Sequence, residues 1–380
     1  MPTGPRSGRS TISSSRLSCS LDNVNGLVLA DDATGALECA SLLAGLNLRV
    51  SIAITCGTAT REGPGIQVAD TESRHLPPEE AAARMREWIH NTSTSIFKKT
   101  DSTLRGNIAA ELLAMLETSG TRTIVYVPAY PAVGRTVIDG QLFVHGTPIA
   151  DTEFARDARQ PVRSSRIADL FPPSARPCIV HIPDAAALAA ALRDNTPRIL
   201  ICDAASTANI DQLAAALRQS ANPTWVAGPA GFIEAWTTLN AFPRSVPPAL
   251  PRPCKWLVVC GSRHPQSRRQ ADRAEAAGLP VIRTSEQTNE SPELVAAALA
   301  QRTLEHIGKQ KPDAVLIMGG DTVWALWNAM GITALLPLPE LLPGIAACLS
   351  PERNLLFVTK AGGFGDDRLV EQILDRCNRT

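Results

Sequence analysis

The residues best suited to chemistry lie in one short stretch, KKTDSTLRGN, at positions 98–107. It follows an apolar run at 95–97 that predicts a strand, and it precedes an apolar periodicity over 108–116 that predicts a helix. A loop at the carboxyl end of a parallel strand is where open α/β sheets bind their ligands. Its cations, hydroxyls and carboxylate suit a polyhydroxylated anion, whereas the alternative is a solvated turn in which Ser102 or Thr103 caps the next helix. This loop alone does not decide between the two.

Two other predicted strands also end in charged residues. The strand at 26–30 precedes Asp31 and Asp32, which could hold a cation or accept protons from substrate hydroxyls, or cap the helix expected over 36–46. The strand at 66–69 precedes Arg74, which is placed for a bidentate contact with a carboxylate, a surface salt bridge being the alternative. Each of these charged residues thus follows the end of a predicted strand, as the stretch at 98–107 does.

The rest of the first half continues the alternation of strands and helices. A polar run at 151–157 follows an expected β-hairpin and could face the site or a partner subunit. Five prolines between positions 243 and 253 indicate a linker. The remaining strands are expected at 50–55, 124–127, 178–182, 199–202 and 225–227, the helices at 78–90, 184–194 and 208–219, and the hairpin at 136–150.

The second half repeats the pattern, and three of its strand ends carry small residues. These turns begin at Gly261-Ser262, Gly319-Gly320 and Gly362-Gly363. Exposed backbone N–H groups in such turns suit phosphates, although any tight turn needs glycine. Neither the P-loop motif nor the dinucleotide-binding fingerprint occurs. The strands are expected at 256–259, 280–284, 314–318 and 355–359, and the helices at 266–277, 292–309 and 323–330.

Length and composition narrow the class of protein. A chain of 380 residues exceeds the roughly 250–300 residues of most single cores, so two domains are expected. Lys plus Arg and Asp plus Glu balance at 37 each, which gives no case for a nucleic-acid or membrane surface. No apolar run reaches the roughly 18 residues that span a bilayer, and the nine scattered cysteines suggest reduced thiols in a cytoplasmic protein. We expect a disordered tail at 1–24, domains at 25–243 and 254–380, and a linker at 244–253.

Taken in order, these segments resemble the four-carbon acid sugar kinase family. The similarity spans about residues 26–375 and departs mildly at Glu72, where an Asp is expected, and at Ala33, where a larger apolar residue is usual; the turn at 261–264 also carries more positive charge than expected. The matching segments are ADDATGA (30–36), DTESR (70–74), KTDSTLRGN (99–107), PAYP (128–131), GRT (134–136), EFARD (153–157), GGDT (319–322) and TKAGGFGD (359–366).

This resemblance implies a fold of two α/β domains, each with its own mostly parallel sheet flanked by helices and with the active site in the cleft between them. It implies phosphorylation of the terminal hydroxyl of a four-carbon sugar acid by ATP, with D-threonate as the first expectation. D-erythronate and 3-oxo-tetronate are the alternatives, as is a non-catalytic sensor of a sugar acid or nucleotide. The implied partners are small molecules, without nucleic acid or membrane, and a homodimer stays open.

The resemblance also assigns residues. Mg²⁺ is expected to bridge the phosphates, with its protein ligands unassigned, and either Asp32 or Asp101 could be the base. The implied sugar-acid residues are Asp31, Asp32, Arg74, Lys99, Thr100, Asp101, Ser102 and Arg105. The implied ATP residues are Ser262, Gly319, Gly320, Asp321, Thr322, Gly362, Gly363, Phe364 and Gly365.

A division of labour between the domains can be tested by substitution. Replacing Arg74 or Arg105 with Ala should weaken sugar-acid binding by about one to two powers of ten, because a charge-assisted contact contributes roughly 1.5–3 kcal/mol, and it should spare ATP. Gly363→Val should do the reverse, because the side chain would block the approach of phosphate and resist a positive φ. Separate titrations of ATP and sugar acid measure both effects. The same pattern of losses in both kinds of variant would contradict the division.

Overall fold

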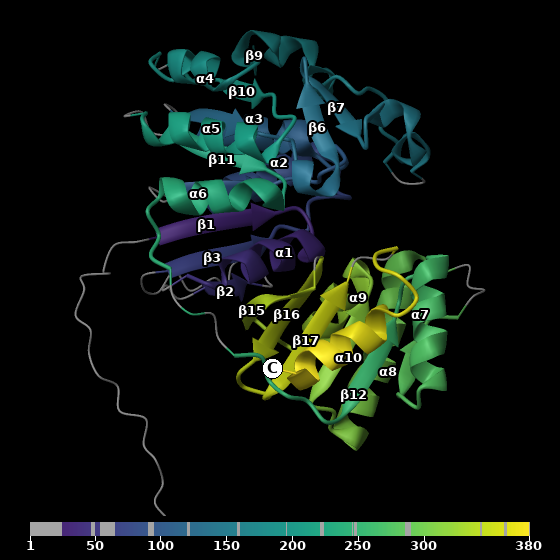
Figure 1. Cartoon of the computed structure of the whole chain (residues 1–380). Coiled ribbons are helices and arrows are strands. Elements are labelled where there is room, and N and C mark those ends of the chain that lie inside the picture. Colours follow the sequence, from purple (N-terminus) through teal and green to yellow (C-terminus); the bar gives the residue numbers. More distant parts are fainter. Residues whose placement is uncertain are drawn as a thin grey trace, which may run out of the picture.

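The computed structural model describes residues 25–46, 50–53, 65–89, 95–119, 122–157, 160–194, 196–220, 224–244, 246, 249–285, 290–342, 344–360 and 363–379. The predicted tail at 1–24 and the predicted ATP residue Gly362 lie outside these ranges. The described residues form a mixed α/β structure in which helices flank a large, mostly parallel sheet (Figure 1).

The first half of the chain builds a parallel sheet of short, buried strands. Strands covered on both faces read as continuous apolar runs, which is the pattern of the sequence here. In spatial order they are β2 (Val50–Ala53), β3 (Gly65–Asp70), β1 (Asn25–Ala30), β4 (Ser95–Lys99), β11 (Thr224–Gly228), β5 (Thr123–Tyr126), β10 (Ile199–Cys202) and β9 (Ile179–Ile182).

Helices cover both faces of this sheet (Figure 1). One face carries α1 (Ala33–Leu43), α4 (Ala185–Ala191), α5 (Thr207–Arg218) and α6 (Ile233–Leu239), and the other carries α2 (Pro78–Ile89) and α3 (Ile108–Ser119). The expected hairpin is confirmed as a small antiparallel sheet of β6 (Arg135–Ile138), β7 (Gln141–Val144) and β8 (Thr147–Pro148). Short 3₁₀ helices lie at Pro131–Val133, Ile149–Asp151, Glu153–Arg156, Ile167–Leu170, Pro173–Cys178 and Ala230–Phe232.

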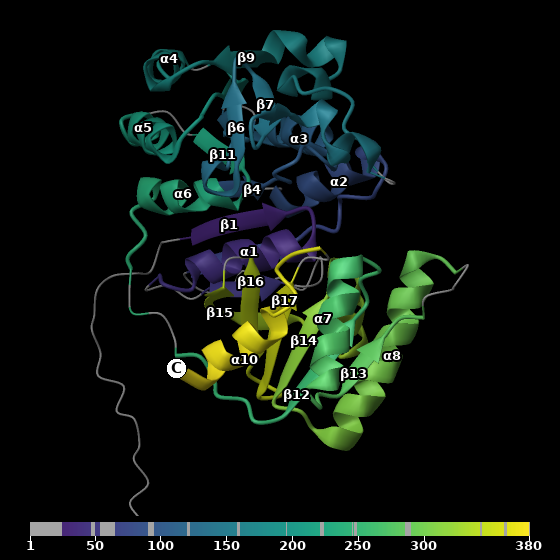
Figure 2. The same ribbon diagram turned by 45° about the vertical axis from the view of Figure 1, so that its right-hand side comes forward.

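The second half has its own sheet with helices on both faces (Figure 2). Its parallel strands are β13 (Val281–Arg283), β12 (Trp256–Cys260), β14 (Ala314–Met318) and β17 (Leu355–Lys360), followed by the antiparallel β16 (Ile345–Ser350) and β15 (Ala334–Leu342). One face carries α7 (Pro265–Ala276) and α10 (Leu369–Arg379), and the other carries α8 (Pro292–Gln310) and α9 (Gly320–Ala329).

The expected fold of two α/β halves, each with a mostly parallel sheet, is confirmed, and the two sheets are in addition joined at their edges. Strand β15 pairs antiparallel with β2 through Ala334 opposite Ala53 and Leu335 opposite Ile52, which makes one ladder of 14 strands. Pro337 and Pro339 follow directly in β15 and have no N–H to donate, so they offer nothing to extend this pairing. The sequence analysis did not predict β15, because a proline within an apolar run argues against a strand.

Helix α1 packs at this junction. It contacts β15, β16 and α9 of the second half in addition to the strands of the first. Buried apolar residues of both halves therefore form one continuous cluster, to which Leu43, Leu335 and Trp327 belong. The opposite face of the second sheet has a separate cluster under α7 and α10.

The junction should contribute strongly to stability. Leu335 is 2% exposed and the next residue, Leu336, is 40% exposed, so the pair gives a matched comparison on one strand. Leu335→Ala should lower the free energy of unfolding by about 2–5 kcal/mol, because the cavity stays unfilled, and Leu336→Ala by less than about 1 kcal/mol. Denaturant titration measures both values. Equal losses would show that the junction does not carry this stability.

Candidate active site between the two halves

Strand register brings the charged loops of the first half together. Ala30 pairs with Asp70 of β3 on one side and with Lys99 of β4 on the other. The three strands therefore end level, and the loops that follow them emerge side by side. The segments at 31–32, 71–74 and 100–107 therefore share one edge of the sheet.

The second half is aligned in the same way. Met318 of β14 pairs with Cys260 of β12 and with Lys360 of β17, so the turns that begin at Gly261 and Gly319 are neighbours. The backbone N–H groups of Gly261 and Ser262 both donate to the carbonyl oxygen of Met318, at 3.1 and 3.0 Å. These two turns form the end of the second sheet that faces the first half.

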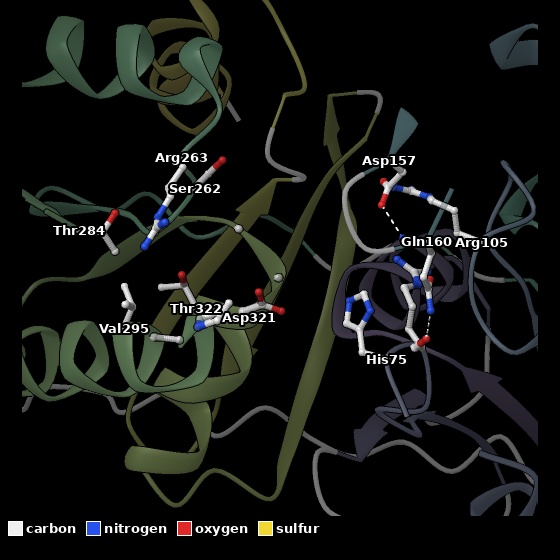
Figure 3. Close-up of a pocket in the computed structure, with 16 residues that line it drawn as sticks. His75, Arg105, Asp157, Gln160, Ser262, Arg263, Thr284, Val295, Asp321 and Thr322 are labelled. Atoms are coloured by element: carbon white, nitrogen blue, oxygen red, sulfur yellow. Dashed lines mark hydrogen bonds and ion pairs between the residues drawn. The ribbon is translucent and has the colours of Figure 1, made fainter. Parts of the chain in front are cut away.

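A pocket of about 440 Å³ lies between the two sets of loops (Figure 3). In Figure 3 the labelled side chains form two groups that face each other across the pocket. The first half contributes Arg74, His75, Arg105, Asp157 and Gln160, and the second contributes Gly261, Ser262, Arg263, Thr284, Pro292, Val295, Ala296, Gly319, Gly320, Asp321 and Thr322.

Arg74 is held by three carboxylates behind the pocket wall. Its Nε and Nη2 donate to the two oxygens of Asp31, at 2.8 and 2.9 Å, and its Nη1 donates to Oδ2 of Asp32 at 2.5 Å. The Oδ2 atom of Asp101 lies 3.7 Å from Nη2. Burial alone would raise the pKa of Asp31, but Arg74 and the neighbouring lysines outweigh it and hold the pKa below its usual value. Asp31 is therefore charged, and the guanidinium of Arg74 neutralises it.

Both carboxylate oxygens of Asp101 accept hydrogen bonds. It accepts from the backbone N–H of Thr103 at 2.8 Å, from the Thr103 hydroxyl, and from Nη2 of Arg105 at 2.9 Å. Burial would raise the pKa of Asp101, yet Arg74 and Arg105 lower it well below its usual value. Arg105 also lies 3.4 Å from a carboxylate oxygen of Asp157, so it bridges the two acids.

Gln160 ties these loops together from the pocket side. Its amide donates to the carbonyl oxygen of Arg74 at 2.6 Å, and its oxygen accepts from the backbone N–H of Gly106 at 2.9 Å. Asp157 in turn accepts from the backbone N–H of Gln160 at 2.9 Å. Asp157 and Gln160 therefore brace both arginine loops.

Lys99 is not among the residues that line this pocket. It is buried, and its Nζ lies 3.7 Å from a carboxylate oxygen of Glu38 on α1. Burial would lower the pKa of Lys99, but Glu38 and other negative groups raise it above its usual value. The backbone N–H of Thr100 is taken by the carbonyl oxygen of Gly228.

Crowding explains the glycine at 261 and the start of α9. A Cβ on Gly261 would lie 1.7 Å from the Thr322 hydroxyl, so only glycine fits. Gly319 caps α9 at φ 117°, a conformation that side chains resist. The first residues of α9, Gly320 to Thr322, thereby line the pocket with their backbone.

The expectation that Gly363 has a positive φ is wrong, whereas its expected role at ATP stays a prediction. Gly363 is absent from the residues with positive φ, whereas Gly365 has φ 79°. A Cβ on Gly363 would instead lie 2.8 Å from Nε2 of His264, so its small size serves contact with that ring. The Gly363→Val variant therefore also tests packing against His264.

Seven of the predicted residues line the pocket, namely Arg74, Arg105, Ser262, Gly319, Gly320, Asp321 and Thr322. Asp31, Asp32 and Asp101 are not among the lining residues, but each of them contacts Arg74, which is. Lys99, Thr100, Ser102, Gly363, Phe364 and Gly365 are not among the lining residues. The roles of all these residues stay predictions.

Sequence reasoning missed several lining residues, and few carried a signal. Asp157 ends the polar run that was expected to face the site or a partner, but Gln160 has no motif around it. Arg263 was noticed only as extra positive charge. His75, Thr284, Pro292, Val295 and Ala296 had no chemical pattern, because they become neighbours only through folding.

Within the described residues, no group of three or more His, Cys, Asp or Glu side chains is arranged to hold a metal ion. The same residues include no helix that is long and apolar enough to cross a membrane. The carboxylates that line the pocket are Asp157 and Asp321, one on each wall.

Glu72 should make stability depend on pH. It has φ 46°, and burial raises the pKa of its carboxyl from 4.5 to about 7, with Arg84 opposing the shift. The folded state thus binds this proton more tightly, and the stability it contributes is lost as pH rises through about 7. Glu72→Gln should gain melting temperature relative to the native chain between pH 5 and 8, unlike the exposed Glu80→Gln. A pH-independent difference would contradict the assignment.

Comparisons with known proteins agree with this arrangement. A family model for a sugar-binding N-terminal domain matches residues 26–236, and one for a nucleotide-binding C-terminal domain matches residues 280–370. A D-threonate kinase from Cupriavidus necator is 29% identical, covering 90% of this chain and 95% of its own. A D-erythronate kinase from Heliobacterium modesticaldum is 31% identical, and the match covers 67% of this chain and 61% of the kinase. A 3-oxo-tetronate kinase from Brucella melitensis is 25% identical, and the match covers 90% of this chain and 93% of the kinase.

Solved structures support the fold. A Salmonella typhimurium protein described as a putative tRNA synthase has a TM-score of 0.73 at 22% identity, covering 94% of this chain and 99% of its own. A Haemophilus influenzae protein has a TM-score of 0.70 at 20% identity, covering 93% and 99%. With a sugar-binding N-terminal domain, a nucleotide-binding C-terminal domain and relatives named as tetronate kinases, the chain belongs to the four-carbon acid sugar kinase family.

Proposed function

We propose that the protein transfers the γ-phosphoryl group of ATP to the terminal hydroxyl of D-threonate, giving 4-phospho-D-threonate. The main observation that supports this function is the pocket between the two halves, which has an Arg–Asp cluster on one wall and glycine turns on the other. D-threonate is supported by the kinases from Cupriavidus necator and Salmonella typhimurium, which align over 95% of their lengths at 29% and 27% identity. D-erythronate and 3-oxo-tetronate are the alternative substrates.

The sugar acid is proposed to lie against the first half, with its carboxylate at Arg105. Both arginines use three donor atoms on neighbouring carboxylates, but the Arg105 side chain is 31% exposed and that of Arg74 only 14%. A partly exposed guanidinium can turn its remaining N–H groups to the carboxylate of a substrate. Arg74 then organises the acids that face the substrate hydroxyls.

The nucleotide is proposed to lie against the second half. Backbone N–H groups at the start of α9, from Gly320 onward, attract phosphate because the N-terminus of a helix carries a partial positive charge. The side chain of Arg263 adds a full charge on the same wall. The apolar side chains of Val295 and Ala296 offer a surface for the adenine base of ATP.

We propose Asp32 as the general base that accepts the proton of the substrate hydroxyl. In the reaction a bond forms between the hydroxyl oxygen and the γ-phosphorus, the bond to the bridging oxygen of ADP breaks, and the hydroxyl proton moves to a carboxylate. Asp101 is fully engaged with Thr103 and Arg105, and its lowered pKa makes it a poor acceptor. Asp32 also uses both oxygens, one on the α1 cap and one on Arg74, but its side chain is 26% exposed, whereas that of Asp101 is 8% exposed.

Mg²⁺ fits the donor chemistry of this pocket. Carboxylate oxygens are the protein ligands that Mg²⁺ accepts, and Asp321 and Asp157 supply them from opposite walls. We propose Asp321 as the protein contact, because Asp157 also pairs with Arg105. When bound, the ion would neutralise charge that develops on the phosphates.

The boundary between the domains is proposed at residues 244–253. No helix or strand is assigned to the described part of this segment, which leads from α6 to β12. Limited proteolysis that cut elsewhere first would argue against this boundary.

A homodimer is also proposed. It is supported by a Bordetella bronchiseptica protein, solved as a domain-swapped dimer with bound citrate, which has a TM-score of 0.51 at 24% identity and covers 93% of this chain and 98% of its own. Light scattering that gave the mass of one chain would exclude it.

A coupled assay of ADP release tests the function. The protein with ATP and Mg²⁺ should turn over D-threonate faster than D-erythronate or a 3-oxo-tetronate. Asp32→Asn should lower kcat by about 10²–10⁴ and leave ATP binding unchanged, because Asn still caps α1 but cannot take a proton. The exposed Asp211→Asn is the control. Binding of ATP without turnover of any of the three acids would favour a sensor.

A further inference from the structure

A buried ion pair lies behind the loop that carries Arg74. The Nζ atom of Lys98, on β4, is 3.0 Å from Oε2 of Glu111, on α3, and the two side chains are 0% and 1% exposed. Burying two charges is costly, and well-packed apolar residues in place of such a pair are often as stable or more so. Stability alone therefore does not account for the pair.

The pair is bonded to the Arg74 loop through side chains. The hydroxyl of Ser73, which directly precedes Arg74, donates to the other carboxylate oxygen of Glu111. The Ser73 and Thr71 hydroxyl oxygens are 2.7 Å apart, and the Thr71 hydroxyl donates to the carbonyl oxygen of Ala30 at 2.8 Å. A continuous chain of contacts thus runs from α3 to the end of β1, directly before Asp31.

The main chain of the same loop is held from other directions. The amide of Asn107 donates to the carbonyl oxygens of Ser73 and Leu76, at 2.7 and 2.8 Å. Gln160 donates to the carbonyl oxygen of Arg74. These bonds position the backbone of the loop, while Glu111 holds the side chain of Ser73 from within the core.

We propose that Glu111 and Lys98 are positioning residues for the sugar acid: through Ser73 they set the Arg74 guanidinium against Asp31 and Asp32. This rests on the proposed function, in which those carboxylates face the substrate hydroxyls. Arg74 reaches both acids at hydrogen-bond distance, and a shift of the loop by an ångström would break that geometry. A misplacement of this size in a site costs about a hundredfold in rate.

The test replaces the pair without leaving a buried charge. Lys98→Met with Glu111→Leu keeps the volume apolar and removes the bond to Ser73. We expect an unchanged or higher melting temperature, a fall of about tenfold to a hundredfold in kcat/KM for D-threonate, and an unchanged KM for ATP. The matched control is Arg86→Met with Glu117→Leu, which removes an exposed ion pair between α2 and the same helix α3, at 2.8 Å. This control should change neither kcat/KM for D-threonate nor KM for ATP.

A second set of variants tests the proposal even if the double variant does not fold. Ser73→Ala removes the same bond from the loop side and should reproduce the loss in kcat/KM. Lys98→Met with Glu111→Gln leaves no buried charge, keeps an oxygen that can accept the Ser73 hydroxyl, and should retain most of the activity. Adding Ser73→Ala to a folded variant with Lys98→Met and Glu111→Leu should cost nothing more, because the bond is already absent.

Unchanged kcat/KM in Ser73→Ala, or a parallel loss for both substrates together with a lower melting temperature, would overturn the positioning role. The proposed function fails separately, if the native protein phosphorylates none of the three acids. In that case titration of D-threonate into the native chain and Ser73→Ala still compares their affinities, and equal affinities would overturn the positioning role on its own.

Discussion

The site depends on one constraint: charges taken out of water must be neutralised by their neighbours. Asp31 and Asp101 are almost fully buried, and Arg74 lies between them and Asp32. Removing one member of such a group leaves an uncompensated charge and costs far more than the group gains by being present. The loops at the ends of β1, β3 and β4 are therefore tied to one another. Their common geometry follows from Arg74 as much as from the sheet.

The opposite wall is built by crowding instead of charge. Gly261 admits no side chain because Thr322 fills the space, and Gly319 adopts a conformation that suits glycine. The N–H groups of Gly261 and Gly319 donate to the carbonyl oxygens of Met318 and Lys360, so these glycines shape the wall through their small size and conformation. The two walls thus differ in chemistry: one has arginines and a carboxylate, which we propose for the sugar acid, and the other has glycine turns and a helix start, which we propose for phosphate.

The connection between the walls is a short stretch of strand pairing. Two residue pairs join β15 to β2, and the prolines at 337 and 339 offer no N–H to extend them. Helix α1 buries apolar surface of both halves at the same place and carries Asp32 at its start. The residues that stabilise the junction therefore lie next to those that bind Arg74, so stability and site geometry share one element.

The sequence by itself determined the α/β alternation, nearly all the parallel strands, and the strand-end loops with their charges or glycines. These are local properties, because apolar runs, helix periodicity and turn residues act over a few neighbouring positions. Only the tertiary structure decided what is close in space. It turned Lys99 toward Glu38, bonded Gln160 to Arg74, placed Val295 on the pocket wall and passed the ladder from β2 to β15 through a proline-containing strand. Such contacts join residues far apart in the chain, and their energies depend on burial and on partners that no local pattern records.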